Sequence, residues 1–432
     1  MLYQFFPGLS LYSNASHSSY LSPFQAHRRI ARMDEIYSLT IRGNETMVAL
    51  EANFEGGNAE DVRTIGPDHL SFRARKDRSP RPLWFYFRLT NVKERRVKLE
   101  LANASECLGG TARAWKVTRP VFSYDCARWE RITEAEYIDE KGVFSFSQTF
   151  AEDTAWVAFC YPYIYSDLLR YLESVKDSPY ARVDVIGSSA EGRKLYALTI
   201  TDFGVGDSGK VGIAATARHH AGETPGSFSM EGMMDFLLSE DEVASEMRRK
   251  LAFRIYPMVD VDGVYKGAYG KHSRGRENDF NRDWTENPKR PEVKAVKEDL
   301  DRWARSCDYR AFFDFHAPTP GDENYFYVVS SSESGQKYHG KVLSFLWTLA
   351  RVCADQYASD DYREVDRSDP EWEDWNRSST YYQYDRYGVL SLCCEMSYNT
   401  NRFGRYMTQD AMRELGKGIA LAMYEMACGE GL

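Results

Sequence analysis

Short runs in which apolar residues alternate with polar ones fill the chain from about residue 46 to residue 159. They are rich in valine, phenylalanine, tyrosine and tryptophan, which favour strands because they pack well on a pleated surface. Turn-forming segments such as 55–58 separate them. The predicted strands lie within 47–54, 69–75, 83–90, 96–103, 121–125, 143–150 and 156–163. Regularly spaced short strands with no helical pattern between them predict an antiparallel β-sandwich.

The periodicity changes after residue 163, where leucines at helical spacing predict a helix over 165–175 with Ser166 as its N-cap. From there, strands and helices alternate along the chain. Strands are predicted at 194–202, 211–217, 251–259, 309–315 and 388–397, and helices at 227–239, 291–306, 340–357 and 410–427. This alternation predicts an α/β domain with a mixed, mostly parallel sheet covered by helices.

The change of pattern divides the chain into two predicted domains. A β-sandwich domain is expected over 33–163 and an α/β domain over 164–432, because 432 residues are too many for one ordinary core. The serine-rich residues 1–32 are expected to form a flexible extension, and they lack the basic and apolar regions of a signal peptide. Met33 is an alternative start of the protein.

Composition narrows the class of protein. A net charge of −9 argues against general nucleic-acid binding. The sequence has no apolar stretch near the roughly 20 residues of a membrane span, so no membrane partner is expected. The eight cysteines include no Cys-x-x-Cys pair, which predicts reduced thiols and a cytoplasmic protein rather than a disulfide scaffold.

Polar residues that can bind a metal follow three of the predicted strands. His219, His220 and Glu223 come after the strand at 211–217, while His316 and Glu395 stand at the ends of two later strands. Functional groups of open α/β sheets gather at the carboxyl ends of strands. A His-x-x-Glu pair with a distant histidine is a zinc-ligand set that leaves a fourth position open for water. The alternative is a histidine that only makes a hydrogen bond at a strand end.

These residues occur within an ordered set of motifs. The set consists of Arg218-x-His220-Ala-Gly-Glu223-Thr, Pro257-x-x-x-x-Asp262-Gly263, Asp279-Phe-Asn281-Arg282-Asp-Trp284, His316 and Glu395. It resembles the M14 zinc metallocarboxypeptidases, and segment 185–200 resembles the one that opens their catalytic domain. The predicted sandwich resembles the N-terminal domain of the cytosolic carboxypeptidase branch, which includes enzymes that trim glutamates from tubulin tails. The resemblance covers roughly residues 46 to 425.

The resemblance implies a metal site for a single zinc ion. His220 and Glu223 match the family's first two zinc ligands, and His316 matches the third. His219 falls outside this ligand pattern, so it is expected to be an exposed histidine or one that supports a ligand. Asp279 matches the carboxylate that accepts a hydrogen bond from a zinc-binding histidine, which fixes the histidine tautomer.

The resemblance also implies how a substrate is bound and cleaved. Asn281 and Arg282 match the pair that binds the terminal carboxylate of a peptide, a task for which the planar guanidinium is well suited. Glu395 matches the general base that acts on zinc-bound water and then protonates the leaving amine. The family also has an arginine upstream of this pair that polarises the scissile carbonyl. In this sequence the spacing between the arginine candidates and Asn281-Arg282 differs from the spacing common in the family. Arg274 is the preferred candidate, with Arg276 as the alternative.

Two further features leave the specificity open. Some members of the family use a tyrosine before the general base, and here Tyr381, Tyr382, Tyr384 and Tyr387 are candidates. Basic residues cluster near the carboxylate-binding motif or precede the general base, namely Lys271, Arg274, Arg276, Lys289, Arg290, Arg377 and Arg386. This cluster favours acidic C-terminal residues of the substrate, unless it is simply a solvated basic loop.

The resulting hypothesis is a zinc-dependent carboxypeptidase that acts on the C-terminal tails of peptides or proteins. One alternative within related folds is a deacylase of the aspartoacylase or succinylglutamate desuccinylase type, which also uses His-x-x-Glu and a distant histidine. A cell-wall peptide carboxypeptidase is another. An alternative of a different class is an inactive protein that binds partners through its sandwich. An inactive relative is expected to have lost a ligand or the base, and here the candidates His220, Glu223, His316 and Glu395 are all present.

Overall fold

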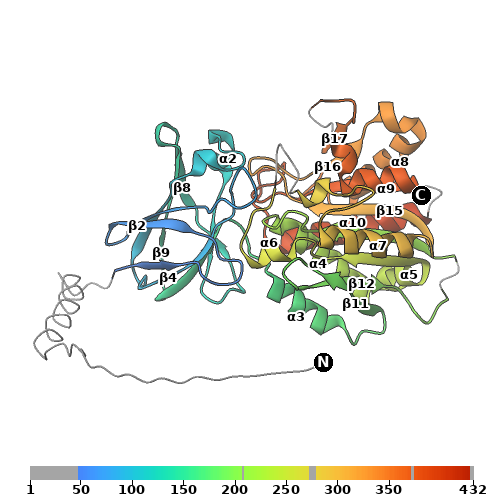
Figure 1. Ribbon diagram of the computed structural model, residues 1–432, viewed down its shortest axis with the longest axis horizontal. Coiled ribbons are helices and arrows are strands. Elements are labelled where there is room, and N and C mark those ends of the chain that lie inside the picture. Colours follow the sequence, from blue (N-terminus) through green and yellow to red (C-terminus); the bar gives the residue numbers. More distant parts are fainter. Residues whose placement is uncertain (1–46, 207–208, 272–278, 371–373, 429–432) are drawn as a thin grey trace, which may run out of the picture. The chain divides into compact units, whose positions relative to one another are not determined.

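The computed structural model describes residues 47–206, 209–271, 279–370 and 374–428 (Figure 1). Residues 47–432 belong to one compact unit. Within it, an all-β region, blue to teal in Figure 1, precedes an α/β region coloured green to red. The fold class predicted from the sequence is therefore confirmed.

The β domain consists of two five-stranded sheets. The first has the order β1-β4-β10-β6-β7, with β1 (Ala49–Glu51), β4 (Tyr86–Thr90), β10 (Thr154–Ala158), β6 (Val121–Ser123) and β7 (Glu130–Arg131). The second has the order β2-β3-β5-β9-β8, with β2 (Glu60–Gly66), β3 (His69–Arg73), β5 (Arg96–Leu101), β9 (Val143–Thr149) and β8 (Glu134–Ile138). The strand pairs are antiparallel except β3 with β5. Each sheet contributes phenylalanines to a common core, in which Phe72 of β3 packs edge-on against Phe87 of β4 with ring centroids 4.9 Å apart.

The sequence pattern missed the polar edges of this domain. Strands β2 and β8 read EDVRTIG and EAEYI and lie at opposite ends of one sheet, where their side chains are largely exposed. An edge strand buries too few apolar side chains to show clear alternation. The structure also contains a short helix α2 (Ala112–Val117) between strands, where no helix was predicted. Its Trp115 is buried against Phe144, so tertiary packing stabilises this helix.

The α/β domain is built on one eight-stranded mixed sheet with the order β11-β12-β14-β13-β15-β18-β16-β17. The central strands β14, β13, β15 and β18 are parallel to one another. The strands are β11 (Ala181–Ser188), β12 (Lys194–Ile200), β13 (Val211–Ala217), β14 (Leu251–Tyr256), β15 (Asp308–His316), β16 (Tyr325–Val329), β17 (Tyr362–Val365) and β18 (Leu390–Glu395). The parallel strands read as nearly continuous apolar runs because both of their faces are covered.

Helices cover both faces of this sheet (Figure 1). One apolar cluster joins Ile213 and Phe313 of the sheet to α4 (Thr224–Leu238), α8 (Ser331–Val352) and α10 (Gln409–Cys428). A second joins Ala214 and Phe312, the alternate residues of the same strands, to α7 (Pro291–Ala304), with α9 (Ser379–Tyr387) packed against it. The other helices are α3 (Tyr165–Val175), α5 (Glu242–Lys250) and α6 (Val261–Tyr265), with 3-10 turns at Ala104–Glu106, Asp139–Lys141, Phe280–Arg282 and Trp375–Arg377.

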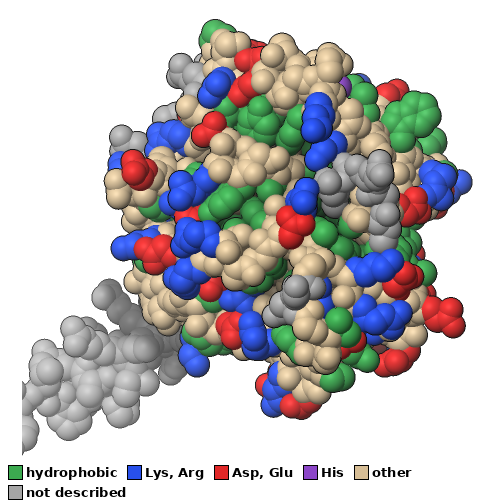
Figure 2. Space-filling view, turned by 90° about the vertical axis from the view of Figure 1, so that its right-hand side faces the viewer, with side chains coloured by type: hydrophobic (Ala, Val, Ile, Leu, Met, Phe, Trp, Pro, Cys, Tyr) green, Lys and Arg blue, Asp and Glu red, His purple; other side chains and the backbone are tan. Residues whose placement is uncertain are grey.

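The surface carries charges of both signs. On the face that Figure 2 presents, lysine and arginine side chains are interspersed with aspartate and glutamate side chains. Among the side chains coloured there, no single sign of charge dominates this face.

Helices α4 and α10 touch backbone to backbone, and this contact can be tested. A Cβ atom at Gly416 would lie 1.7 Å from the Ser229 carbonyl oxygen. Gly416→Ala is therefore expected to destabilise the fold by about 2–3 kcal/mol, because two buried helices must separate to admit a methyl group. The control is Gly340→Ala on α8, where a Cβ meets nothing within 4 Å. Removing that helical glycine is expected to be neutral or to stabilise by up to about 1 kcal/mol. Urea-unfolding midpoints measure both, and equal midpoints would contradict the packing argument.

Candidate active site

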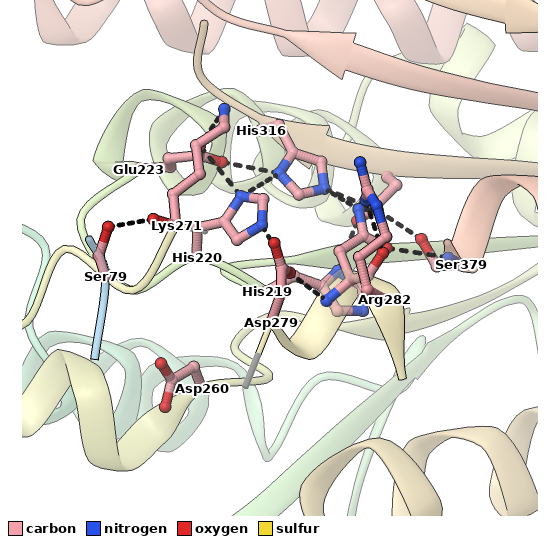
Figure 3. A network of polar contacts seen from close by, with 12 residues as sticks. Ser79, His219, His220, Glu223, Asp260, Lys271, Asp279, Arg282, His316 and Ser379 are labelled. Atoms are coloured by element: carbon pink, nitrogen blue, oxygen red, sulfur yellow. Dashed lines mark hydrogen bonds and ion pairs between the residues drawn. The ribbon is translucent and has the colours of Figure 1, made fainter. Parts of the chain in front are cut away.

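The ends of three neighbouring strands bring the polar residues of the motifs together. Strand β15 lies between β13 and β18, so the segments that follow these strands meet at one edge of the sheet. His316 and Glu395, which are 79 positions apart in the chain, are direct register partners on β15 and β18. Figure 3 shows His220, Glu223 and His316 pointing toward one another at this edge.

A tight turn after β13 aims the first two of these side chains. Arg218 has a φ of 61°, a strained backbone conformation for a residue with a side chain. Its buried guanidinium holds the turn by donating to the carbonyl oxygens of Tyr163, at 2.8 Å, and of Ala221. Gly222 is required because a Cβ there would lie 2.5 Å from the Tyr269 ring. Glu223 then occupies the N-cap position of α4.

Three ligand atoms converge in a buried cluster. His220 Nδ1 lies 3.1 Å from Glu223 Oε1, and His316 Nδ1 lies 2.7 Å from Glu223 Oε2 and 3.1 Å from His220 Nδ1. Each of these residues is at most 4% exposed. Two imidazole nitrogens and a carboxylate oxygen are a donor set that suits zinc. The residues present therefore fit the ion that the motifs imply.

The far side of each imidazole is held by a carboxylate. His220 Nε2 lies 3.0 Å from Asp279 Oδ1, and His316 Nε2 lies 2.7 Å from Asp314 Oδ2. Burial by itself would raise the pKa of Asp279, but the adjacent His220 outweighs it and holds this pKa below its usual range. Carboxylates in this position fix the tautomer, so that the Nδ1 atoms face the metal site as ligands.

Asp314 belongs to the site by its contacts, and the sequence reasoning missed it. It is fully buried on β15, and its carboxylate contacts a ring of polar side chains. These are Thr216 Oγ1 at 2.7 Å, His219 Nδ1 at 2.9 Å, Asn281 Nδ2 at 3.0 Å, His316 Nε2 at 2.7 Å and Ser379 Oγ. The sequence feature that could have identified Asp314 is its spacing from His316, because residues two apart on a strand point to the same face.

His219 does not point into the metal cluster. It is completely buried, so the alternative of an exposed histidine is wrong. Its Nδ1 lies 2.9 Å from Asp314 Oδ1, and its Nε2 accepts a hydrogen bond of 3.0 Å from Trp284 Nε1. His219, Asp314 and His316 also form a group close enough to hold a metal. Both ring nitrogens of His219 already have partners, however, so we interpret this group as support for His316.

Glu395 stands beside the cluster with an unused carboxylate oxygen. The residue is 4% exposed, and among the residues that the structure describes its Oε2 has no hydrogen-bond partner. Burial raises the pKa of the Glu395 carboxyl above its ordinary value, and although the Lys271 ammonium opposes this shift, the charge of Glu223 adds to it. A buried carboxyl group with a raised pKa is suited to accept and release a proton near neutral pH.

The predicted carboxylate-binding pair lies in the turn Phe280–Arg282. The Asn281 amide donates to Asp314 and accepts a 2.9 Å hydrogen bond from the Ser379 backbone, so it ties this turn to the support of His316. Arg282 Nη1 donates to the Asn281 carbonyl oxygen at 2.7 Å, and its Nε lies 3.3 Å from Asp374 Oδ1. The two neighbours therefore differ, since Asn281 bonds to a carboxylate that supports His316, whereas Arg282 bonds to Asp374 and to the Asn281 backbone.

The tyrosines of α9 bond to groups outside the metal cluster. Tyr381 donates to Glu333, and the hydroxyls of Tyr382 and Tyr387 lie 3.1 Å and 2.8 Å from Asp301 oxygens. Tyr384 packs against the ring of Tyr338. These contacts favour a packing role for the four candidates.

A tyrosine on another strand lies closer to the general-base candidate. Tyr325 of β16 is the register partner of Glu395, a neighbour that the sequence gave no reason to choose. It approaches Glu395 only because β16 pairs with β18 in the folded sheet.

Lys271 brings a positive charge to the metal cluster. Its Nζ donates to Glu223 Oε1 at 2.7 Å and to the Ala317 carbonyl oxygen at 3.2 Å, and its side chain is 22% exposed. The expectation of a solvated basic loop is therefore wrong for this lysine. Arg274 and Arg276, the candidates for polarising the carbonyl, lie outside the described residues.

A His₂Glu cluster at the strand ends of a mixed α/β sheet, with a free carboxylate beside it, defines a metal-dependent hydrolase site. Two family models match the chain, the cytosolic carboxypeptidase N-terminal domain over residues 50–160 and the zinc carboxypeptidase domain over residues 168–419. The chain belongs to the M14 family of zinc carboxypeptidases.

Individual relatives agree with this assignment. Cytosolic carboxypeptidase 3 of Mus musculus is 26% identical over 365 residues, with 78% of this chain and 36% of the relative covered. Cytosolic carboxypeptidase 6 of Homo sapiens is 35% identical over 256 residues, with 54% and 49% covered. The chain thus spans between about a third and a half of the length of these relatives.

The fold is also shared with a solved structure. The crystal structure of a metallo-carboxypeptidase from Burkholderia cenocepacia matches with a TM-score of 0.75 and 26% identity, covering 88% of this chain and 98% of that one.

Among the helices that the structure describes, none combines the length and the apolar character needed to cross a bilayer.

Proposed function

We propose that this protein is a zinc-dependent carboxypeptidase that hydrolyses the last peptide bond of peptides or protein tails. The observation that carries the proposal is the buried cluster of His220, Glu223 and His316 beside Glu395, whose Oε2 has no hydrogen-bond partner among the described residues. His220, Glu223 and His316 hold one zinc ion. When bound, zinc supplies a Lewis acid that activates water and polarises the scissile carbonyl.

Glu395 acts as the general base in this proposal. Its Oε2 takes a proton from the attacking water and later delivers it to the amine that leaves. Its raised pKa supports both transfers, because the carboxylate accepts a proton readily and does not hold it too strongly. Asp279 and Asp314 keep the two histidines in the tautomer that leaves Nδ1 for the metal.

Arg282 restricts cleavage to chain ends in this proposal, and Asn281 holds the turn that carries it. The guanidinium pairs with the terminal carboxylate of the substrate, and an internal peptide bond offers no such group. Arg282 is 9% exposed and held by Asp374 and by the Asn281 carbonyl oxygen, so its fork is oriented before the substrate arrives. Asn281 contributes mainly by fixing this turn against Asp314.

A preference for acidic C-terminal residues is part of the proposal. Arg363 on β17 lies with its Cζ 3.8 Å from the centre of the Tyr325 ring, and Tyr325 is the register partner of Glu395. This guanidinium pairs with Asp322 at 3.4 Å, and it can bind an acidic side chain of a substrate in the same way. The names of the relatives, and the absence of a disulfide among the seven described cysteines, support action in the cytoplasm.

The test is a set of short peptides that differ in the last residue, each with a free and an amidated C-terminus. The wild type is expected to cleave free peptides, fastest with glutamate or aspartate last, and to leave the amides intact. Arg282→Ala is expected to raise KM for free peptides by about 10- to 100-fold, since a charge-assisted hydrogen bond contributes about 1.5–3 kcal/mol. Arg405→Ala is the control, because this arginine is exposed and lies 3.7 Å from Asp355.

Mass spectrometry of the products measures each rate. Equal cleavage of free and amidated peptides would refute action at the chain end. Hydrolysis of N-acyl amino acids in place of peptides would favour the deacylase alternative instead.

A further inference from the structure

The β domain holds the backbone of the loop that leads to the metal cluster. Gly56 donates to the Tyr265 carbonyl oxygen at 2.9 Å, and Asn58 Nδ2 donates to the Gly267 carbonyl oxygen at 2.7 Å. Asp77 accepts hydrogen bonds from the backbone of Tyr269 and of Gly270, the latter at 3.0 Å. These contacts join residues that are between 192 and 209 positions apart in the chain.

A further contact from the β domain reaches Lys271 itself. Ser79 Oγ donates to the Lys271 carbonyl oxygen, as Figure 3 shows. Arg78, between the two anchoring residues, pairs with buried Asp260 at 3.2 Å. Asp260 in turn accepts a hydrogen bond of 2.9 Å from the Gly263 backbone at the start of the same loop. Segment 77–79 of the β domain therefore fixes where the Lys271 side chain begins.

The Lys271 side chain then reaches the metal cluster, where its Nζ donates to Glu223. Its ammonium carries three N–H groups. Among the residues that the structure describes, Glu223 and Ala317 accept two of them, which leaves one for an oxygen atom of a substrate. The ammonium therefore contacts one of the metal ligands, and its charge acts to lower the pKa of the Glu395 carboxyl, on the strand next to His316.

We propose that Lys271 is a catalytic residue, and that Asp77 and Ser79 of the β domain position it. This proposal rests on the carboxypeptidase function proposed above. Lys271 Nζ donates a hydrogen bond to the carbonyl oxygen of the scissile bond while that oxygen becomes negative. A preorganised cation stabilises this charge most strongly in a site that excludes water, and the surrounding residues here are buried.

The step balances without any further reactant. The water oxygen forms a bond to the carbonyl carbon, the π electron pair moves to the carbonyl oxygen, and the proton of the water goes to Glu395. Lys271 remains protonated and only donates a hydrogen bond. The carbonyl then re-forms, the C–N bond breaks with its electron pair going to nitrogen, and Glu395 returns its proton to that nitrogen.

Substitution of Lys271 in the full chain tests the catalytic role. Lys271→Met is expected to lower kcat by about 10²- to 10³-fold with little change in KM, as removal of one such donor does in other hydrolases. Lys271→Arg is expected to restore much of this loss because it keeps a positive donor. The matched control is Lys266→Met, since Lys266 also pairs with a glutamate but has a side chain that is 57% exposed.

Two readouts do not depend on turnover. The zinc content of Lys271→Met is expected to equal that of the wild type, measured by elemental analysis. Calorimetry is expected to show that a phosphinic peptide, whose tetrahedral anion resembles the reacting carbonyl, binds Lys271→Met about 10²-fold more weakly. The affinity for the product amino acid is expected to stay unchanged.

Asp77→Asn and Ser79→Ala test the role of the β domain. Each is expected to lower kcat about tenfold and to weaken phosphinic-peptide binding by a similar factor, the size of one lost hydrogen bond. Zinc content and thermal midpoint are expected to stay at the wild-type values. Asp139→Asn is the control, because it changes an exposed carboxylate of the same domain.

The outcomes separate this proposal from the proposed function. An active wild type with equal kcat for Lys271→Met and Lys266→Met would overturn the role of Lys271 and leave the carboxypeptidase assignment standing. Loss of zinc from Lys271→Met would also overturn it, since the lysine would then only assemble the metal site. A wild type that holds zinc but cleaves no free peptide would overturn the proposed function, and this proposal with it.

Discussion

Glu395→Gln is expected to lower kcat by about 10²- to 10⁴-fold while the protein keeps its metal, because the amide cannot take a proton from water. Glutamine has nearly the same shape, so the buried site at the end of β18 is expected to keep its packing. Zinc content, the thermal midpoint and the affinity for product are expected to match the wild type. Peptide hydrolysis under saturating substrate measures the loss.

The surroundings of Glu395 allow this experiment to separate a loss of catalysis from a loss of stability. Its Oε2 has no protein partner among the described residues, so the substitution breaks no hydrogen bond at that atom. A loss of stability therefore does not explain a loss of rate. The control is Glu414→Gln on α10, which changes an exposed carboxylate. Gln383→Glu on α9 would not serve, because that residue is fully buried. Retention of more than about a tenth of the wild-type kcat in Glu395→Gln would argue against the general-base role.

Loss of the metal is expected to have the largest effect. His220→Ala removes one of three ligands, so zinc is expected to fall from about one ion per chain to a trace. Activity is then expected to fall by about 10⁴-fold or more, since a Lewis acid contributes several kcal/mol and each 1.4 kcal/mol is a factor of ten. Treatment of the wild type with a chelator is expected to give the same loss, and added zinc is expected to restore only the wild type.

The control for this experiment is another histidine. His69→Ala changes a half-buried histidine of the β domain that lies 3.2 Å from Glu100. It is expected to keep zinc and activity. A chelated enzyme with wild-type activity, or a His220→Ala variant with a full complement of zinc, would refute the metal site.

The strands next to the site were well predicted from sequence, and the edges of the sheets were not. The predicted strand 211–217 coincides with β13, because its apolar run is buried on both faces. The first helix after it begins at Thr224, three residues before the predicted 227, since the N-cap is Glu223, itself a ligand candidate. Helix α5 and the edge strand β17 were missed because short amphipathic or edge elements lack a clear period, and β16 was missed because a five-residue apolar run is too short to identify by periodicity.

The sequence by itself was enough to predict which residues gather at the site. His220, Glu223, His316 and Glu395 each follow or end a strongly apolar strand, and the rule that parallel strands present their carboxyl ends at one edge was enough to predict that they meet. The spacing of His-x-x-Glu also separated His220 from His219 before any contact was known. These features are local, so a linear pattern contains them.

Only the tertiary structure decided what surrounds those residues. Asp314 supports His316 and His219 because β13 with the turn after it, the turn Phe280–Arg282 and the start of α9 meet at its carboxylate. Lys271 belongs to the metal cluster because Asp77 and Ser79, in another domain, hold its loop. The sequence assigned this lysine only a general basic character. Such contacts are set by packing between segments distant in the chain, and no local pattern specifies which distant segment a side chain will meet.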